Sequence, residues 1–290
     1  MENKVIKLMD YFEKPKGISI VVVSFERLGA LKVLLDALIK QDYRGIPVEL
    51  ILVNNSPRYN LSKSLFSAVG RRIGKISDCK IVNSQFNWGP GIRYAMATTA
   101  AYQTLLFIDD DIFPTDYTFI ADMYSEFMKL DEHDILTCWA DLWVDWGEDF
   151  LTTASINFLS PEIKRLTECD YAGTGINMIR KRTLIHPDLL DIRPEFKFAD
   201  TAWYPWLPTI IYGSHKYYYP SYNRLAFHKE KKIGSLCARE GYEQFIFSAR
   251  KEMLALGYLP ARSRMPNNTW VSGSPEEEAA NTIPLVKRPW

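Results

Sequence analysis

Apolar and polar residues in the first half of the chain follow two periods in turn. Short apolar runs rich in β-branched residues are typical of strands that are covered on both faces. They occur at residues 17–25, 48–54, 79–83 and 104–108. After each run, apolar residues recur at helical spacing. We expect these helices at residues 29–41, 60–73, 92–99 and 115–129.

This alternation of strand and helix predicts the fold class. Strand–helix repeats of this kind favour a Rossmann-like α/β fold, in which a mainly parallel sheet is flanked by helices. In open sheets of this kind, ligands bind at the carboxyl ends of the strands. The residues that directly follow the apolar runs are therefore the first candidates for a functional site.

The second half of the chain is less regular. The aromatic stretch at 139–158 (beginning WADLWVDWGEDF) has no clean period, so we expect irregular structure there. Other segments still carry a pattern. We expect a strand at 171–179 that is entered through glycines, a proline-shortened helix within 198–213, short strands at KYYYP and RLAFH, and an amphipathic helix at 238–257.

Composition and charge narrow the function classes. The chain has 290 residues, of which 47% are hydrophobic, enough for a sizeable core. Lys plus Arg and Asp plus Glu each number 35, and this balance argues against a general nucleic-acid binder. The four cysteines form no CxxC pair, and neither a signal peptide nor a membrane span is visible. We therefore expect a reduced, cytoplasmic protein.

Three consecutive aspartates follow the fourth apolar run, in LLFIDDDIFP (105–114). Adjacent carboxylates repel one another, so this run needs either open water or a bound cation. A solvated turn is one interpretation. The other is a Mg²⁺ or Mn²⁺ site, because these hard cations prefer carboxylate oxygens. The position of the run at the end of a buried strand favours the cation.

Four segments, in order along the chain, resemble a known family. They are ISIVVVSFERLGALKVLLDAL, VELILVNNSP, NWGPGIRYAM and LLFIDDDIFP. Together they resemble the inverting glycosyltransferases of the GT-A fold, and most closely family 2. The likeness covers residues 17–130 well and 170–235 more loosely. It implies transfer of a sugar from a nucleoside-diphosphate sugar to a hydroxyl acceptor, in bacterial glycan or polysaccharide biosynthesis.

The resemblance also implies a division of the chain and a set of donor-binding residues. The two halves would be a nucleotide-sugar-binding half (17–135) and an acceptor-binding half (136–259). Composition alone predicts the remaining parts, a polar N-terminal arm (1–16) and a polar, proline-rich mobile tail (260–290). The residues that correspond to the family's donor contacts are Ser24, Phe25, Glu26, Arg27, Asn54, Asn87, Gly89, Arg93, Asp109 and Asp110. Phe25 could equally be a core residue, Arg93 a solvated helix residue, and Asn54 stands where the family often has an aspartate.

The same resemblance assigns the chemistry. Asp109 and Asp111 with His228 would hold the metal, Mn²⁺ or Mg²⁺, and Asp200 would be the base that deprotonates the acceptor hydroxyl. Asp200 could instead cap a helix, and Asp170, Asp188 and Asp191 are other candidates for the base. The acceptor side would include Gly173, Thr174, Gly175 and Trp203. Further sugar-stacking candidates are Trp139, Trp143, Trp146 and Trp206.

The expected partners are a nucleoside-diphosphate sugar and a glycan or lipid-linked glycan acceptor. Peripheral contact with the inner face of a membrane stays open, whereas nucleic acid is not expected. Three alternatives remain: a nucleotidyltransferase of similar fold, an inactive sugar-binding homologue, and a glycosyltransferase that acts on a modified nucleic-acid base. The basic clusters Arg71–Arg72 and Lys229–Lys232 would serve the last of these.

Overall fold

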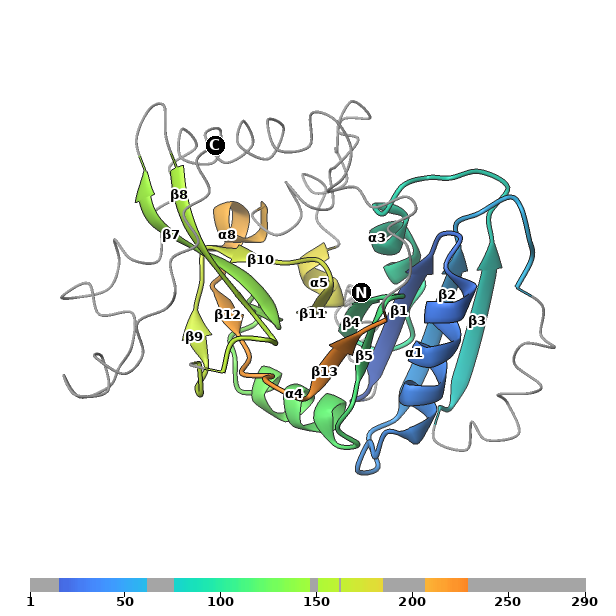
Figure 1. Cartoon of the computed structure of the whole chain (residues 1–290), viewed down its shortest axis with the longest axis horizontal. Helices are drawn as coiled ribbons and strands as arrows, with labels where there is room; N and C mark the ends of the chain where they lie inside the picture. The colour runs from blue at the N-terminus through green and yellow to red at the C-terminus, as the bar shows by residue number, and fades with distance from the viewer. Residues whose placement is uncertain (1–15, 62–75, 147–150, 162, 185–206, 229–290) are drawn as a thin grey trace, which may run out of the picture.

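The computed structural model of the chain describes residues 16–61, 76–146, 151–161, 163–184 and 207–228. One eight-stranded sheet forms the centre of the molecule (Figure 1). Its strands are, in order across the sheet, β3 (Asp78–Asn83), β2 (Val48–Asn54), β1 (Ile18–Ser24), β4 (Thr104–Asp109), β11 (Ile176–Arg180), β6 (Ile135–Thr137), β12 (Lys216–Tyr218) and β9 (Thr167–Glu168).

The four apolar runs seen in the sequence form four neighbouring parallel strands. β1 pairs in parallel with β2 and with β4, and β2 pairs in parallel with β3. The next strand, β11, runs antiparallel to β4, with Ile176 opposite Ile108. The sheet is therefore mixed but mostly parallel at the end that carries the aspartates, and the predicted fold class is confirmed.

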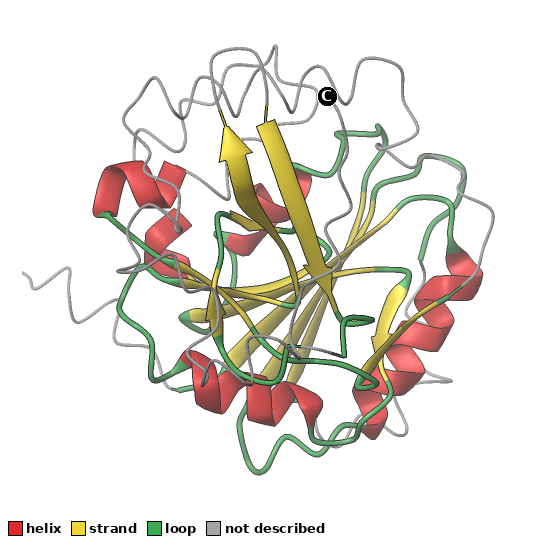
Figure 2. Cartoon of the chain, turned by 60° about the vertical axis from the view of Figure 1, so that its left-hand side comes forward, coloured by secondary structure: helices red, strands yellow, loops and turns green. Residues whose placement is uncertain are grey.

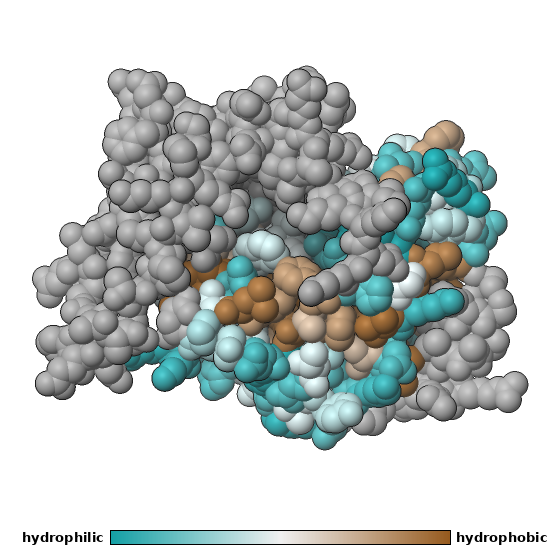
Figure 3. Space-filling view, viewed as in Figure 1, coloured by the Kyte–Doolittle hydropathy of each residue, from teal (hydrophilic) through white to brown (hydrophobic). Residues whose placement is uncertain are grey.

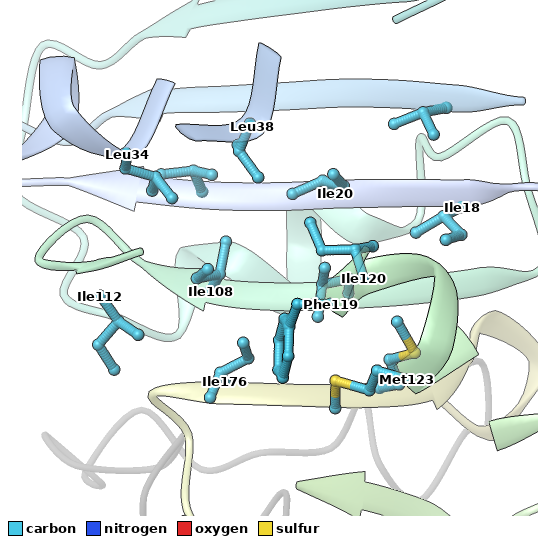
Figure 4. Close-up of a cluster of buried hydrophobic side chains, with 14 of the residues drawn as sticks. Ile18, Ile20, Leu34, Leu38, Ile108, Ile112, Phe119, Ile120, Met123 and Ile176 are labelled. Carbon is cyan, nitrogen blue, oxygen red and sulfur yellow. The ribbon is translucent and has the colours of Figure 1, made fainter. Parts of the chain in front are cut away.

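Helices cover the sheet, and the core lies between them and the strands. The described helices are α1 (Leu28–Lys40), α3 (Ile92–Ala97), α4 (Phe119–Phe127), α5 (Lys181–Leu184) and α8 (Leu207–Tyr212). Apolar side chains of α1 and α4 meet those of β1, β4 and β11 in one buried cluster (Figure 4). Leu34 of α1, Phe119 of α4 and Ile20 of β1 are fully buried there. Because each helix buries one face, its apolar residues recur at helical spacing in the sequence.

The aromatic stretch after residue 138 forms strands, so the prediction of irregular structure there was wrong. β7 (Trp139–Trp146) and β8 (Leu151–Asn157) form an antiparallel hairpin, and β10 (Tyr171–Ala172) adds to β7 (Figure 2). Alternate residues of β7 belong to two sets. One set includes Ala140 and Leu142, both buried, whereas the other set contains both tryptophan and aspartate. Because tryptophan is apolar, this mixture hid the two-residue period.

A two-stranded ladder joins distant parts of the chain in front of the main sheet. β5 (Ile112–Pro114), directly after the aspartates, pairs antiparallel with β13 (Leu225–Phe227) (Figure 1). The short strand predicted at RLAFH is thus present, whereas the strand at 112–114 was not predicted. It follows that residue 228 lies beside the aspartate run.

Some predictions fall outside the described residues: the arm, most of the helix at 60–73, residues 198–206, the helix at 238–257 and the tail. Within the described ranges, no helix is long and apolar enough to cross a bilayer. Cys79, Cys138 and Cys169 are free thiols.

Candidate active site

The aspartate run lies where β4 ends. Asp109 is the last residue of β4, and Asp110 and Asp111 form the turn into β5. The carboxyl end of β1 lies alongside, because Val23 pairs with Asp109. The loop that follows β1 therefore reaches the three carboxylates.

Arg27, in that loop, binds two of the aspartates. Its Nη1 atom donates to Asp111 Oδ2 and lies 3.2 Å from Asp110 Oδ1. The Arg27 side chain is 20% exposed, so this contact is partly shielded from water. One guanidinium thus balances part of the charge that makes three adjacent carboxylates unfavourable.

Asp110 is the most buried of the three aspartates. Burial raises the pKa of its carboxyl group to about 7, although the nearby Arg27 guanidinium acts in the opposite direction. Its Oδ2 atom is buried and accepts no hydrogen bond of normal geometry, although the nearby Ser24 hydroxyl acts to lower the pKa of this carboxyl group. Burial and the charge of Asp109 likewise raise the pKa of Asp111, against the effect of Arg27. The corner is therefore short of positive charge.

Arg93 binds the first aspartate from the other side. It lies in α3, and its Nη2 atom donates to Asp109 Oδ1 at 2.8 Å. Its Nη1 atom donates to the backbone carbonyl of Thr174 at 2.8 Å. The Arg93 side chain is only 8% exposed. Arg93 is thus a buried partner of the aspartate run and not a solvated helix residue.

The glycine segment 173–175 lies against the same corner. The backbone N–H of Asp109 donates to the Gly175 carbonyl at 2.7 Å. A Cβ atom on Gly175 would lie 3.5 Å from Asp109 Oδ2, and one on Gly173 would lie 2.8 Å from the carbonyl oxygen of Trp139. Glycine is therefore required at 173 for this close approach.

Two adjacent asparagines end β2, and they do different things. The Asn54 side chain stabilises neighbouring parts of the fold, because its amide donates to the carbonyl of Tyr59 and to Asn83 Oδ1. Asn55 instead holds the loop before α3. Its Nδ2 atom donates to Asn87 Oδ1 at 3.0 Å and to the Gly89 carbonyl at 2.9 Å.

This second asparagine was not among the residues predicted from the sequence. Its Oδ1 atom also accepts the backbone N–H of Trp88, so three hydrogen bonds fix the loop. The loop contains both Asn87 and Gly89, and Gly89 has a positive φ of 72°. The NN pair after a buried strand was the available signal, but it does not tell which amide faces the loop.

The β5–β13 ladder brings His228 to the aspartates. The backbone N–H of His228 donates to the Asp111 carbonyl at 2.8 Å. Phe227, one residue earlier, packs 4.6 Å from Phe158 and 5.9 Å from Trp139, measured between ring centroids. Phe227 keeps 38% of its surface exposed, on the face of β13 and β5 where Figure 3 shows apolar residues.

The remaining predicted residues divide into two groups. Ser24 is buried at the end of β1, Phe25 is half-buried, and Glu26 has a φ of 60° and an ion pair with Arg58. These three lie in the loop that presents Arg27. The predicted base, Asp200, and the acceptor residue Trp203 lie outside the described residues.

A divalent cation fits the chemistry of this corner. Carboxylate oxygens are the donors that Mg²⁺ and Mn²⁺ prefer, and the Asp110 Oδ2 atom accepts no hydrogen bond of normal geometry. Among the described residues, however, no group of three or more His, Cys, Asp or Glu side chains is arranged as a ready metal site. The arginines occupy carboxylate oxygens that a metal would use.

The mixed, mostly parallel sheet flanked by helices matches the GT-A glycosyltransferase fold. The model of the family "Glycosyl transferase family 2" matches residues 19–183, which is more than half of the chain. The chain belongs to this family, as the four sequence segments predicted. A search of curated protein sequences found no match to the chain.

Solved structures resemble this chain at low sequence identity. S. aureus TarS is 18% identical over 70% of this chain, with a TM-score of 0.48, and this chain covers 36% of it. TarS 1–349 in complex with UDP-GlcNAc is 17% identical over 82% of this chain, with a TM-score of 0.50 and 66% of that chain covered. The mannosyltransferase PcManGT from Pyrobaculum calidifontis, in complex with GDP-Man and Mn²⁺, is 12% identical over 60% of this chain, with a TM-score of 0.38 and 48% of that chain covered.

Proposed function

We propose that this protein transfers a sugar, with inversion, from a nucleoside-diphosphate sugar to a hydroxyl acceptor. The observation that carries the proposal is the corner at the end of β4. There Asp109, Asp110 and Asp111 meet Arg27 and Arg93 in a chain of a glycosyltransferase family. The neighbouring strand ends and the loop held by Asn55 would form the donor site around this corner.

Donor binding follows from the groups that surround the corner. The diphosphate needs positive charge, and Arg93 would place one beside the corner, where its guanidinium is already bonded to Asp109 and to the Thr174 carbonyl. The loop that carries Asn87 and Gly89 is held against the end of β2, where it would line the donor site. The β1 loop from Ser24 to Arg27 would contact the nucleoside.

Asp109 and Asp111, with His228 beside them, would hold a divalent cation, Mn²⁺ or Mg²⁺. Such a cation, when bound, neutralises the charge that develops on the departing nucleoside diphosphate. The backbone bond between His228 and Asp111 supports the assignment, because it keeps the two residues adjacent.

Asp200 would act as the base that removes the proton from the acceptor hydroxyl. The acceptor side would include the segment 173–175, which runs from Trp139 to Asp109. Aromatic rings beside this segment suit a carbohydrate, and Phe227 offers an exposed ring next to His228. We therefore propose a glycan or lipid-linked glycan acceptor, in bacterial glycan synthesis at the cytoplasmic face of a membrane.

The test is an assay of nucleoside-diphosphate release from a panel of nucleotide sugars, with and without Mn²⁺ and with candidate acceptor glycans. We expect release with one donor class, and loss of it in Asp111→Asn. The matched control is Asp36→Asn, which removes an exposed carboxylate of α1 that pairs with Lys40. Asp200→Asn should lower the rate of transfer by about 10²- to 10⁴-fold.

Other outcomes would contradict the proposal. Full activity of Asp111→Asn would refute the metal assignment. Release of pyrophosphate from a nucleoside triphosphate and a sugar phosphate would identify a nucleotidyltransferase instead. Binding of a nucleotide sugar without turnover under any condition would indicate an inactive homologue.

A further inference from the structure

Arg27 occupies one carboxylate oxygen of Asp111, which is a ligand of the proposed metal. A single nitrogen, Nη1, lies on Asp111 Oδ2 and 3.2 Å from Asp110 Oδ1. These oxygens belong to two different aspartates, so the guanidinium bridges the run in the way a cation would. Arg93 contacts neither of these two oxygens, but it occupies Oδ1 of Asp109, the other carboxylate of the proposed metal site.

The backbone of Arg27 is fixed, whereas its side chain is long. The Arg27 carbonyl accepts the N–H of Leu31 at 2.9 Å, which starts α1. The preceding residue, Glu26, has a φ of 60°, a backbone conformation that is uncommon for a residue with a side chain. Glu26 is also paired with Arg58 at 3.2 Å. Movement of the guanidinium therefore needs only side-chain rotation, without a shift of the loop.

We propose that Arg27 is a built-in counter-cation of the DxD run, which a divalent cation displaces when it binds. This inference rests on the proposed function, because it assumes that Asp111 is a metal ligand. Two cations cannot both contact Asp111 Oδ2 without strong repulsion. Metal binding at this oxygen therefore costs the Arg27 contacts, which in the ligand-free site balance part of the carboxylate charge.

The displaced guanidinium has a second use. Arginine binds phosphate oxygens through paired hydrogen bonds, and a donor diphosphate would bind beside the metal. A nucleotide that engages the released Arg27 lowers the cost of its displacement. Metal and nucleotide then favour one another's binding, and by linkage the effect is reciprocal. Arg27 thereby couples the two binding events.

The experiment measures Mn²⁺ binding directly, by the loss of the electron paramagnetic resonance signal of free Mn²⁺. It is done on the full-length protein, with and without UDP and GDP. Arg27→Met should bind Mn²⁺ alone about tenfold more tightly than the wild type, because the competing cation is gone. The gain in Mn²⁺ affinity on adding nucleotide should be smaller in Arg27→Met than in the wild type.

Two further variants keep the test decisive. Arg58→Met removes one positive charge from a neighbouring exposed position, 74% exposed, without touching the aspartates. It should leave Mn²⁺ affinity within about twofold of the wild type. Arg27→Lys keeps the charge and should bind Mn²⁺ with intermediate affinity. Circular dichroism of each variant confirms that it is folded.

The outcomes separate this inference from the proposed function. If the wild type binds Mn²⁺ and Arg27→Met binds it equally or less tightly, Arg27 does not compete, and the metal-dependent function stands. An equal gain in Arg58→Met would show a general field effect and refute the specific role of Arg27. If neither wild type nor variant binds Mn²⁺ with any nucleotide, the metal assignment fails and this inference with it.

Discussion

Arg93 donates one hydrogen bond to the Asp109 carboxylate and another to the Thr174 carbonyl, each 2.8 Å long. These two bonds connect α3, the end of β4 and the glycine segment before β11. Three stretches that are distant in sequence thus share one buried guanidinium. Its removal should affect both the stability of the fold and the candidate site.

Arg93→Met should destabilise the protein by about 2–3 kcal/mol, because a partly buried carboxylate and a carbonyl lose their donor. The midpoint of urea unfolding measures this change. Arg182→Met is the matched control, since its ion pair with Glu132 is about half exposed. That variant should lose less than about 1 kcal/mol. Equal effects of the two substitutions would contradict the structural role assigned to Arg93.

Asn55→Ala should release the loop at residues 87–89, because it removes three hydrogen bonds. We expect a loss of about 2–3 kcal/mol of unfolding free energy. Nucleotide affinity, measured by calorimetry, should fall in parallel. The exposed Asn60 provides the control, and Asn60→Ala should change stability by less than about 0.5 kcal/mol. Unchanged nucleotide binding in Asn55→Ala would remove this loop from the donor site.

Gly173→Ala should destabilise the protein by about 1–3 kcal/mol. A new Cβ atom would lie 2.8 Å from the Trp139 carbonyl oxygen, and this backbone atom cannot move aside as a flexible side chain could. Thermal unfolding measures the loss, and tryptophan fluorescence should report a shift of Trp139. Gly91→Ala serves as the control, because a Cβ atom there meets nothing within 4 Å. If both variants melt at the wild-type temperature, the packing of this segment is looser than described.

Arg224 should give the protein a pH-dependent part of its stability. Burial opposes ionisation of Asp116 and Asp122, yet hydrogen bonds from Arg224 and Thr118 lower the pKa of both carboxyl groups below 3.8. Because the folded pKa is the lower one, this contribution is present above pH 3.8 and is lost as the pH falls through the folded pKa.

Arg224→Met should therefore cost about 1–2 kcal/mol at pH 7, a value reduced for solvent screening of these partly exposed groups. The difference from the wild type should shrink as the pH falls below 3.8. Urea unfolding at a series of pH values checks this. A difference that stays constant with pH would show that Arg224 acts by packing on Phe119 and not by charge.

Local patterns in the sequence predicted the four parallel strands and the position of the aspartates. β1, β2 and β4 are almost entirely buried, so their residues are mostly apolar and the strands are easily recognised in the sequence. The aspartate run stands out because it interrupts this pattern abruptly. These features need no knowledge of any distant residue.

Long-range pairing could not be predicted in the same way. The sequence left open whether Arg93 is solvated, and only the packing of α3 against β4 places it on Asp109. β5 has three residues and pairs with a strand from the far half of the chain, so neither partner has a recognisable pattern alone. Arg27 was predicted as a donor contact, but its contact with Asp110 and Asp111 depends on the turn geometry.

The ladder between β5 and β13 also has a consequence for folding during translation. Thr115 and Asn223, which close this ladder with a hydrogen bond, lie 108 residues apart in sequence. A ribosome releases the first half of the chain well before the second, so the parallel strands can fold early, whereas the ladder must wait. A nascent chain would therefore carry its aspartates without their histidine neighbour until residue 228 has also left the ribosome.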